Sequence, residues 1–373
     1  MGRDLTIRVL IVDDSAVVRK VLTEIIDAQG DMEVVGVAAD PYIARTKIRK
    51  FDPDVVTLDI EMPRMDGLAF LEALMNFRPL PVIMVSSYSQ KGAEVTLKAL
   101  ALGAVDFLPK PGTRLVDVKT LAEELVEKVR TAATAKVRRV SLNRLRSTIA
   151  EPASQQNERS PKPAPSSARI NVPKMPFDEG VICIGASLGG TNALEFLFEQ
   201  VQNNLPGIVV VQHMPKGFTA AFAKRVNSLV RAEVLEAEDK LGVHPGRIII
   251  AAGGHHLVLE KNKGSYRVRI NTDPEVRRHR PSVDVLFQSA ASCAGKLATG
   301  VLLTGMGEDG ARGLKAMRDA GAWTIAQDEA TSVVWGMPGA AVELGAAKAV
   351  VPLHDIGPML MQAHQSEGLR ASL

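Results

Sequence analysis

Short apolar runs alternate with longer segments of helical periodicity from residue 7 to about residue 130. Each run has the length and the branched aliphatic content of a buried strand, and ten or more residues with helical spacing of apolar positions follow it. The expected strands are residues 7–12, 33–38, 54–60, 81–86 and 104–108. This alternation predicts a five-stranded parallel sheet with helices on both faces.

The same alternation returns after residue 179. Its expected strands are residues 180–186, 207–212, 246–252, 299–304, 322–327 and 347–353. One short hairpin interrupts it, because residues 256–260 and 266–270 alternate apolar and polar positions around a Lys-Asn-Lys-Gly-Ser turn. The second half of the chain is therefore predicted to be a doubly wound α/β domain with a small antiparallel hairpin.

A different composition separates the two regular halves. Residues 131–178 are rich in proline and polar residues, which is typical of a flexible tether that cannot bury a core. We therefore divide the 373 residues into an N-terminal domain (1–130), a linker (131–178) and a C-terminal domain (179–373).

Charge and composition narrow the choice of partners. The net charge of +3 comes from the linker, since residues 1–130 are slightly acidic and residues 179–373 are neutral. With aromatic residues at only 4%, nucleic acid is not an expected partner of either domain. The chain has no apolar run near the roughly 18 residues of a membrane helix and no signal sequence, so we expect a cytoplasmic protein without membrane insertion. Its two cysteines, Cys183 and Cys293, give neither a disulfide framework nor a metal-binding CxxC pair.

Polar side chains follow the strand ends of the N-terminal domain, the edge at which parallel α/β sheets place their sites. Asp13 and Asp14 follow the first strand, Asp59 ends the third, Ser86 ends the fourth and Lys110 follows the fifth. Three neighbouring carboxylates repel one another unless a hard cation such as Mg²⁺ neutralises them. With Mg²⁺, an ammonium and a hydroxyl nearby, one aspartate can accept a phosphoryl group as an aspartyl phosphate. Taken singly, the aspartates are also explained as helix caps or turn residues, and Lys110 as a surface charge.

The order of these motifs resembles the receiver domain of two-component response regulators, which has a flavodoxin-like fold with five parallel strands. The matching segments are Asp13–Ser15, Leu58–Gly67, Met84–Ser87 and Asp106–Pro111. The resemblance implies that Asp59 is the phosphoacceptor and that Asp13, Asp14 and Asp59 hold Mg²⁺. It further places Ser86 at the switch hydroxyl position, Phe107 at the switch aromatic position and Lys110 beside the phosphoryl group. The implied phosphodonor is a histidine kinase.

In the C-terminal domain, Ser187 stands in a strand-turn-helix context. The apolar run Val181–Ala186 breaks into Ser-Leu-Gly-Gly, and the Gly-x-Ser-x-Gly spacing is typical of a sharp turn that exposes a nucleophilic oxygen. The same glycines also suit a phosphate-binding turn or a plain structural turn. His213 and Asp309 follow two other predicted strands, so a serine, a histidine and an aspartate share one edge and can form a hydrolytic triad.

Spacing alone leaves the identity of the base open. His255 and His256 follow another strand and compete with His213. The backbone N–H groups of Leu188 and Met306 are the expected oxyanion donors, because one lies at a helix start and the other in a glycine-rich turn. The chain order of serine, histidine and aspartate differs from that of the α/β-hydrolases and excludes that family.

The whole chain resembles the chemotaxis methylesterases of the CheB family, in which a receiver, a linker and a catalytic domain follow one another. The matching motifs are Ile184–Gly190, Val211–Pro215, His279–Phe287 and Leu303–Gly310. The resemblance implies that Ser187 is the nucleophile, His213 the base and Asp309 its orienting acid. The chain departs from the family pattern at Leu188, where threonine is common, and at Glu308, where an amide is common.

The resemblance also implies a reaction and its partners. The expected reaction is hydrolysis of glutamate γ-methyl esters, and deamidation of glutamines, on the cytoplasmic helices of chemoreceptors, with no cofactor for the esterase step. Arg277, Arg278 and Arg280 are candidates for steering an acidic receptor segment, against the plainer interpretation of a solvated basic loop. Phosphorylation is expected to lift the receiver from the serine. The rival functions are a binding regulator whose glycine turn holds a phosphate, and a DNA-binding response regulator.

Overall fold

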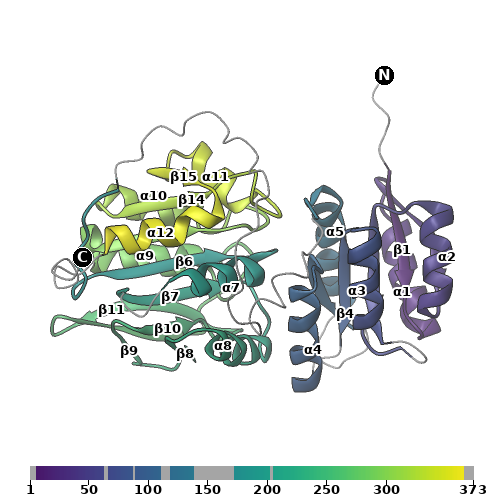
Figure 1. Cartoon of the computed structure of the whole chain (residues 1–373), viewed down its shortest axis with the longest axis horizontal. Coiled ribbons are helices and arrows are strands. Elements are labelled where there is room, and N and C mark those ends of the chain that lie inside the picture. Colours follow the sequence, from purple (N-terminus) through teal and green to yellow (C-terminus); the bar gives the residue numbers. More distant parts are fainter. Residues whose placement is uncertain are drawn as a thin grey trace, which may run out of the picture.

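The structure is a computed structural model, and it describes residues 6–62, 66–86, 89–110, 118–137, 172–201 and 205–364. Two parallel sheets form two bodies, drawn in purple to blue and in teal to yellow (Figure 1). Residues 138–171, which make up most of the predicted linker, lie outside the described residues. None of the helices in the described ranges is both long enough and apolar enough to cross a bilayer.

The N-terminal body is a five-stranded sheet in the order β2-β1-β3-β4-β5, and every strand pair is parallel. Its strands are β1 (Ile7–Val12), β2 (Met32–Ala38), β3 (Val55–Asp59), β4 (Val82–Ser86) and β5 (Asp106–Pro109). Its helices are α1 (Ala16–Asp27), α2 (Pro41–Phe51), α3 (Gly67–Phe77), α4 (Gln90–Ala101) and α5 (Val118–Thr134). This is the predicted receiver fold.

The side chains of β1 alternate between the two faces of this sheet. Val9 and Ile11 pack with α1 and α5, whereas Leu10 and Val12 pack with α2, α3 and α4. Helix α1 is capped by the Ser15 hydroxyl, which accepts from the Val18 N–H, so the interpretation of the preceding aspartates as its cap is wrong.

The C-terminal body is a seven-stranded parallel sheet in the order β15-β14-β13-β6-β7-β10-β8. Its strands are β6 (Val181–Ala186), β7 (Gly207–Gln212), β8 (Glu233–Glu236), β10 (Arg247–Ile250), β13 (Ala298–Leu302), β14 (Trp323–Gln327) and β15 (Ala349–Val351). The predicted hairpin is present as β11 (His256–Asn262) and β12 (Ser265–Asn271), and β9 (Gly242–Val243) pairs with it. The sequence prediction missed β8 and β9, because four and two residues are too short to show a period.

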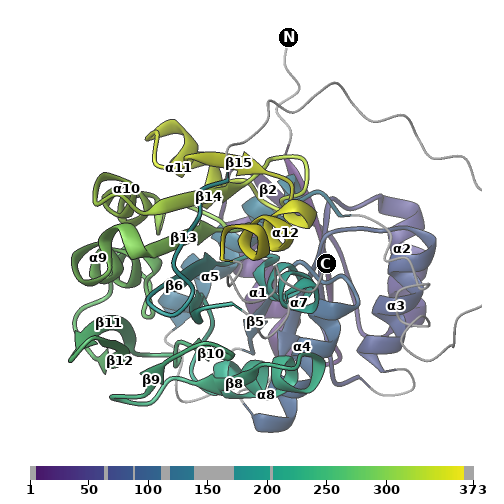
Figure 2. The same ribbon diagram turned by 60° about the vertical axis from the view of Figure 1, so that its left-hand side comes forward.

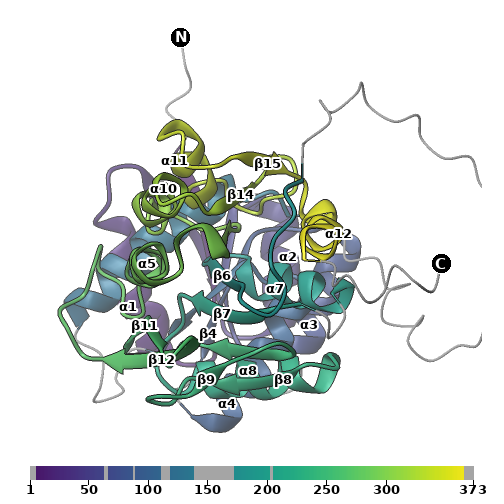
Figure 3. The same ribbon diagram turned by 90° about the vertical axis from the view of Figure 1, so that its left-hand side faces the viewer.

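Helices cover both faces of the larger sheet (Figures 2 and 3). One layer contains α7 (Gly190–Gln200), α8 (Phe218–Leu229) and α12 (Leu353–Ala363). The other contains α9 (Val283–Cys293), α10 (Ala311–Asp319), α11 (Met337–Glu343) and the β11–β12 hairpin. The doubly wound architecture is therefore confirmed.

The two bodies touch along α4, which packs against α7 and α8 (Figure 1). Between them, the Phe107 and Phe218 rings stack with centroids 4.5 Å apart, and the Asn192 amide donates to the Leu100 carbonyl (2.8 Å). Two clefts of about 470 and 370 Å³ are lined by residues of both bodies. The interface is thus incompletely packed.

Candidate active site and phosphorylation site

Ser187 lies directly after β6, in a turn whose shape depends on glycine. Its backbone N–H donates to the Thr304 carbonyl (3.0 Å), and its carbonyl accepts from the Gly190 N–H (2.8 Å) as α7 begins. Gly189 has a φ of +74°, and a Cβ there would lie 2.6 Å from a methyl group of Val333. Because both the conformation and the space require glycine, the turn holds Ser187 half-buried at the carboxyl end of the sheet.

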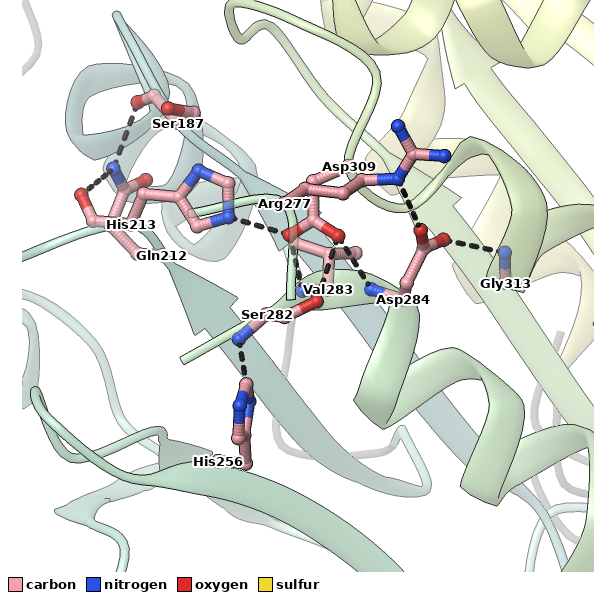
Figure 4. A network of polar contacts seen from close by, with 10 residues as sticks. All are labelled: Ser187, Gln212, His213, His256, Arg277, Ser282, Val283, Asp284, Asp309 and Gly313. Atoms are coloured by element: carbon pink, nitrogen blue, oxygen red, sulfur yellow. Dashed lines mark hydrogen bonds and ion pairs between the residues drawn. The ribbon is translucent and has the colours of Figure 1, made fainter. Parts of the chain in front are cut away.

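His213 follows β7, the strand next to β6. Gln212 Nε2 donates to the carbonyls of both Ser187 (2.8 Å) and His213 (3.2 Å), which joins the two turns. His213 Nε2 lies 2.8 Å from Asp309 Oδ2, and the buried Nδ1 has no hydrogen-bond partner among the described residues. Figure 4 shows the ring between Ser187 and Asp309. The structure therefore gathers the three predicted residues, and the described contacts include the histidine–aspartate hydrogen bond but not a serine–histidine one.

Asp309 lies in the turn between β13 and α10 and is 1% exposed. Its carboxylate accepts from Ser282 Oγ (2.8 Å) and from the N–H groups of Val283 (2.7 Å) and Asp284 (3.1 Å), where α9 begins (Figure 4). Burial alone would raise the pKa of Asp309, but the hydrogen bond and charge of His213, with the donors at α9, lower it to about 2. The positive end of the helix dipole also favours the anion. Asp309 is thus held ionised in a fixed position.

The neighbouring Glu308 does not crowd Asp309. Its side chain is 56% exposed and forms an ion pair with Arg277. Arg280 donates to two backbone carbonyls of the loop that precedes it. Of the three arginines considered for substrate steering, Arg278 alone is exposed and has no partner in the described contacts.

His255 and His256 are the alternatives to His213 as the base, and the structure places His256 in a supporting position instead. His256 is buried, and its Nδ1 accepts from the Ser282 N–H (3.2 Å) while Nε2 lies 3.0 Å from the Pro274 carbonyl oxygen. It supports the segment that holds Asp309. Within the described contacts, neither His255 nor His256 is hydrogen-bonded to Asp309.

The two predicted oxyanion donors are not used elsewhere. The backbone N–H groups of Leu188 and Met306 form no hydrogen bond within the part of the chain that the structure describes. The Leu188 side chain is 4% exposed and packs in an apolar cluster with α1 and α5 of the N-terminal body. The Met306 sulfur contacts Thr131 Oγ1 on α5. Both loops therefore touch the N-terminal body.

At the carboxyl edge of the smaller sheet, carboxylate oxygens of Asp13, Asp14 and Asp59 lie within 4.8 Å of one another. Asp13 and Asp59 are fully buried, and Asp14 is exposed. The pKa of Asp13 is raised to about 6, first by burial and second by the charge of Asp59. Burial also raises the pKa of Asp59. Asp13 Oδ2 has no hydrogen-bond partner among the described residues. A buried oxygen without a donor, inside a set of carboxylates that repel one another, fits a hard divalent cation such as Mg²⁺.

The other predicted receiver residues lie around this cluster. Lys110 Nζ is 2.7 Å from Asp59 Oδ2. Ser86 Oγ, which is buried, accepts from Thr96 Oγ1 of α4 (2.8 Å). Phe107 is 4% exposed, and its ring stacks against the other body rather than against the aspartates. The Lys110 ammonium therefore lies at Asp59, the predicted phosphoacceptor, whereas the Ser86 hydroxyl contacts α4 and the Phe107 ring faces the interface.

Sequence reasoning missed the residues that contact Asp309 and His213, the predicted acid and base of the triad. Ser282 and the N-terminus of α9 hold Asp309, and the ring of His279 stacks on the ring of His213. All of them belong to the segment His279–Phe287, which was recognised as a motif but given no role. The unusual signal there is a histidine and a serine directly before an apolar helix.

A cluster of aspartates at the edge of a five-stranded sheet, joined to a domain with a serine, a histidine and an aspartate at one edge, is the combination found in response-regulator hydrolases. Two family models match the chain accordingly. The response regulator receiver domain matches residues 9–121, and the CheB methylesterase matches residues 182–360.

Relatives with curated names cover nearly the whole chain. The protein-glutamate methylesterase/protein-glutamine glutaminase of Nitrosomonas europaea is 46% identical over 371 residues, which is 98% of each chain. An enzyme of the same name from Xanthomonas euvesicatoria is 49% identical over 362 residues, 97% of this chain and 98% of its own. The chain belongs to the protein-glutamate methylesterase/protein-glutamine glutaminase family. A solved CheB methylesterase catalytic domain from Thermotoga maritima is 38% identical and covers 49% of this chain and 97% of its own, with a TM-score of 0.48.

Proposed function

We propose that Ser187, His213 and Asp309 are the triad with which this methylesterase and glutaminase hydrolyses glutamate γ-methyl esters and glutamine amides on chemoreceptors. The observation that carries the proposal is the 2.8 Å contact between His213 Nε2 and Asp309 Oδ2, with Nδ1 unpaired at the other edge of the ring. Because an ionised carboxylate accepts the Nε2 proton, the lone pair lies on Nδ1. This tautomer is the one that can take the Ser187 proton.

The reaction proceeds in two halves. Ser187 Oγ bonds to the ester carbon while its proton passes to His213 Nδ1, and the imidazolium then protonates the methoxy group, which leaves as methanol. Water next gives a proton to His213 Nδ1 and attacks the acyl-serine. The imidazolium returns that proton to Ser187 Oγ as the acyl bond breaks and the glutamate side chain is released. A glutamine side chain follows the same path with ammonia as the leaving group. Asp309 stays ionised throughout and stabilises the imidazolium.

The tetrahedral oxyanion needs donors that have no other partner. The backbone N–H groups of Leu188 and Met306 meet this requirement within the described residues. Leu188 also stands one residue before Gly189, the N-cap of α7, so the positive end of that helix dipole is close. Replacement of a threonine side chain by leucine leaves this backbone donor in place.

The receiver half is proposed to control the reaction. Asp59 accepts the phosphoryl group of a histidine kinase, with Mg²⁺ held by Asp13, Asp14 and Asp59. Mg²⁺ supplies neutralisation of the carboxylates and of the phosphoryl oxygens. The ammonium of Lys110, already 2.7 Å from Asp59, pairs with the phosphoryl group, and the Ser86 hydroxyl turns from Thr96 toward it.

Contacts between the two bodies support the proposal that the unphosphorylated receiver inhibits the esterase by covering its oxyanion loops. Thr131 on α5 touches Met306, and Leu188 packs into an apolar cluster of the receiver, so both oxyanion loops are covered. The Phe107 ring stacks on Phe218, which links the switch aromatic position to α8. Because two clefts interrupt the packing, a small change of the receiver surface is sufficient to shift the population toward separated bodies.

The proposal includes the division of the chain into residues 1–130, 131–178 and 179–373, with the middle part as the tether that permits separation. It also includes a cytoplasmic location, because the kinase and the methylated receptor helices are there. Neither nucleic acid nor a membrane-inserted segment takes part in it.

The test is methanol release from methylated receptor membranes by the wild type, Ser187→Ala and Asp59→Asn, each with and without a small-molecule phosphodonor. We expect stimulated release by the wild type, no release by Ser187→Ala and unstimulated basal release by Asp59→Asn. Release by Ser187→Ala at the wild-type rate would remove the nucleophile from the proposal. Absence of release by the phosphorylated wild type on a substrate that a related methylesterase hydrolyses would favour a binding regulator.

A further inference from the structure

The imidazole rings of His279 and His213 lie face to face. Their centroids are 3.7 Å apart and their planes are inclined by 15°. This is van der Waals contact, and it is closer than the roughly 4.5–7 Å between centroids that is usual for aromatic pairs. A flat neighbour at this distance blocks rotation of the His213 ring toward that side.

Hydrogen bonds alone do not determine the orientation of the His213 ring. Nε2 has one partner, Asp309, and Nδ1 has none within the described residues. A ring held at one edge can pivot about that hydrogen bond, and the pivot changes the direction of the Nδ1 lone pair. Contact with His279 removes this freedom.

His279 is itself fixed by a tight turn. Val276 and His279 exchange backbone hydrogen bonds (3.1 and 2.9 Å), and Arg277 and Arg278 between them have φ values of 52° and 64°. Residues other than glycine seldom adopt this conformation, so neighbouring groups must hold it. Arg277 does so through ion pairs with one carboxylate of α9 and one in the turn that carries Asp309. The same two elements therefore anchor the turn and the triad acid.

The surroundings keep the His279 ring neutral. Burial, and next the charge of His213, lower the pKa of His279 to about 3, with Lys128 of the receiver acting in the same direction and Asp309 against it. Arg277 and Arg278 on its own turn are further cations. A neutral ring stays in contact while His213 gains and loses a proton, and its π face attracts the imidazolium.

We propose that His279 is a positioning residue, which holds the His213 ring in the plane that directs Nδ1 at Ser187. This inference rests on the proposed function, since it assigns His213 the role of base. His279 acts through the His213 ring and itself takes part in no bond-making or proton-transfer step. Its effect is on the rate of the chemical step and not on receptor binding.

The test compares His279→Ala with His279→Phe in the full-length phosphorylated protein. Phenylalanine keeps a flat ring and removes both nitrogens. We expect His279→Ala to lower kcat for methanol release about 10- to 100-fold with little change in KM, as for a displaced catalytic group. We expect His279→Phe to retain kcat within about 3-fold of the wild type, because a flat ring in the same place preserves the geometry. His244→Ala, a change of an exposed histidine between β9 and β10, is the matched control and should leave kcat unaltered.

Nitrogen NMR of the labelled histidines gives a readout that a merely structural role would not move. Because Asp309 still accepts the Nε2 proton, we expect the same His213 tautomer in all three proteins. We expect exchange broadening of the His213 ring signals in His279→Ala alone, where the ring is free to pivot. Wild-type kcat in His279→Ala, or equal loss in the folded alanine and phenylalanine variants, would overturn the inference. If His279→Ala fails to fold, the kcat and the His213 ring signals of His279→Phe decide. His213→Ala is run beside them, and activity in that variant would overturn the proposed function itself.

Discussion

Both sheets bury an aspartate at the carboxyl edge, yet the two sites treat its charge in opposite ways. In the catalytic body the pKa of Asp309 is lowered to about 2, while in the receiver the pKa of Asp13 is raised to about 6 and that of Asp59 is also raised. Burial acts in the same direction on all three. The difference lies in the neighbours. Asp309 accepts from Ser282, Val283, Asp284 and His213, whereas Asp13 and Asp59 lie beside other carboxylates, and the Lys110 ammonium only partly offsets the effect of burial on Asp59.

The comparison separates a finished site, whose own residues stabilise the charge of its aspartate, from an unfinished site, whose aspartates need a bound cation. The protein itself supplies the hydrogen-bond donors that stabilise the charge of Asp309, so the proposed triad acid is ionised without a bound ligand. Burial disfavours the charged form of the receiver aspartates, repulsion within the cluster adds to that effect, and a bound cation offsets both. A site that is incomplete by itself is the one that responds to a signal.

The largest effect is expected where the finished site is broken. Asp309→Asn keeps the shape but replaces an acceptor-only carboxylate by an amide, which no longer holds His213 in the required tautomer. We expect kcat for methanol release to fall about 10⁴-fold. The matched control is Asp319→Asn, which changes an exposed aspartate paired with Lys315 on α10 and should leave kcat within about 3-fold. Equal losses in the two variants would contradict the distinction between them.

The second effect concerns the unfinished site and its pH dependence. Folding raises the pKa of Asp13 from 3.8 to about 6, so this group costs stability increasingly as the pH rises from 4 through 6, and fully above 6. Bound Mg²⁺ relieves that cost, and protons compete with it at low pH. We expect Mg²⁺ to raise the Tm more at pH 7.5 than at pH 5. At pH 7.5, a hundredfold excess of Mg²⁺ over its Kd should add up to about 2.7 kcal/mol to the free energy of unfolding.

Thermal unfolding monitored by circular dichroism, with Mg²⁺ against an equal concentration of potassium salt, measures this difference. Asp13→Asn is the control, because it removes the titrating group from the cluster. An equal rise in Tm at the two pH values in the wild type would contradict the role of Asp13.

The smallest effect is expected at the contact that joins the two sites. Phe218→Leu weakens the stack on Phe107, so more molecules have separated bodies before phosphorylation. We expect the basal rate to rise about 2- to 5-fold with the phosphorylated rate unchanged, since aromatic pairs contribute only about 1 kcal/mol. Lys224→Ala removes a 3.8 Å ion pair with Glu94 between two well-exposed side chains, and it should change the basal rate by less than about 2-fold. A proportional fall in both rates of Phe218→Leu would mean that the stack does not inhibit.

The sequence predicted the elements that depend on local pattern. Buried strands such as β6 and β7 appear as apolar runs, and the strand-end rule then places Ser187 and His213 on one edge. Position along the chain could not reveal how side chains distant in sequence meet. Glu308 pairs with Arg277, 31 residues away, and His279 reaches His213 through a turn with two unusual φ values. Those contacts depend on the packing of α9 against the sheet, which no periodicity encodes.

The order of the larger sheet has a consequence for the protein while it is being made. The strand β13, whose following turn carries Asp309, pairs with β6 beside Ser187, and Asp309 comes 96 residues after His213. A ribosome adds these residues in roughly 5 to 20 s at the usual rates of synthesis. During that time the growing chain already contains Ser187 and His213, but not Asp309, the carboxylate that contacts His213 Nε2. The proposed triad is therefore incomplete in the nascent chain until β13 and the turn after it have been made.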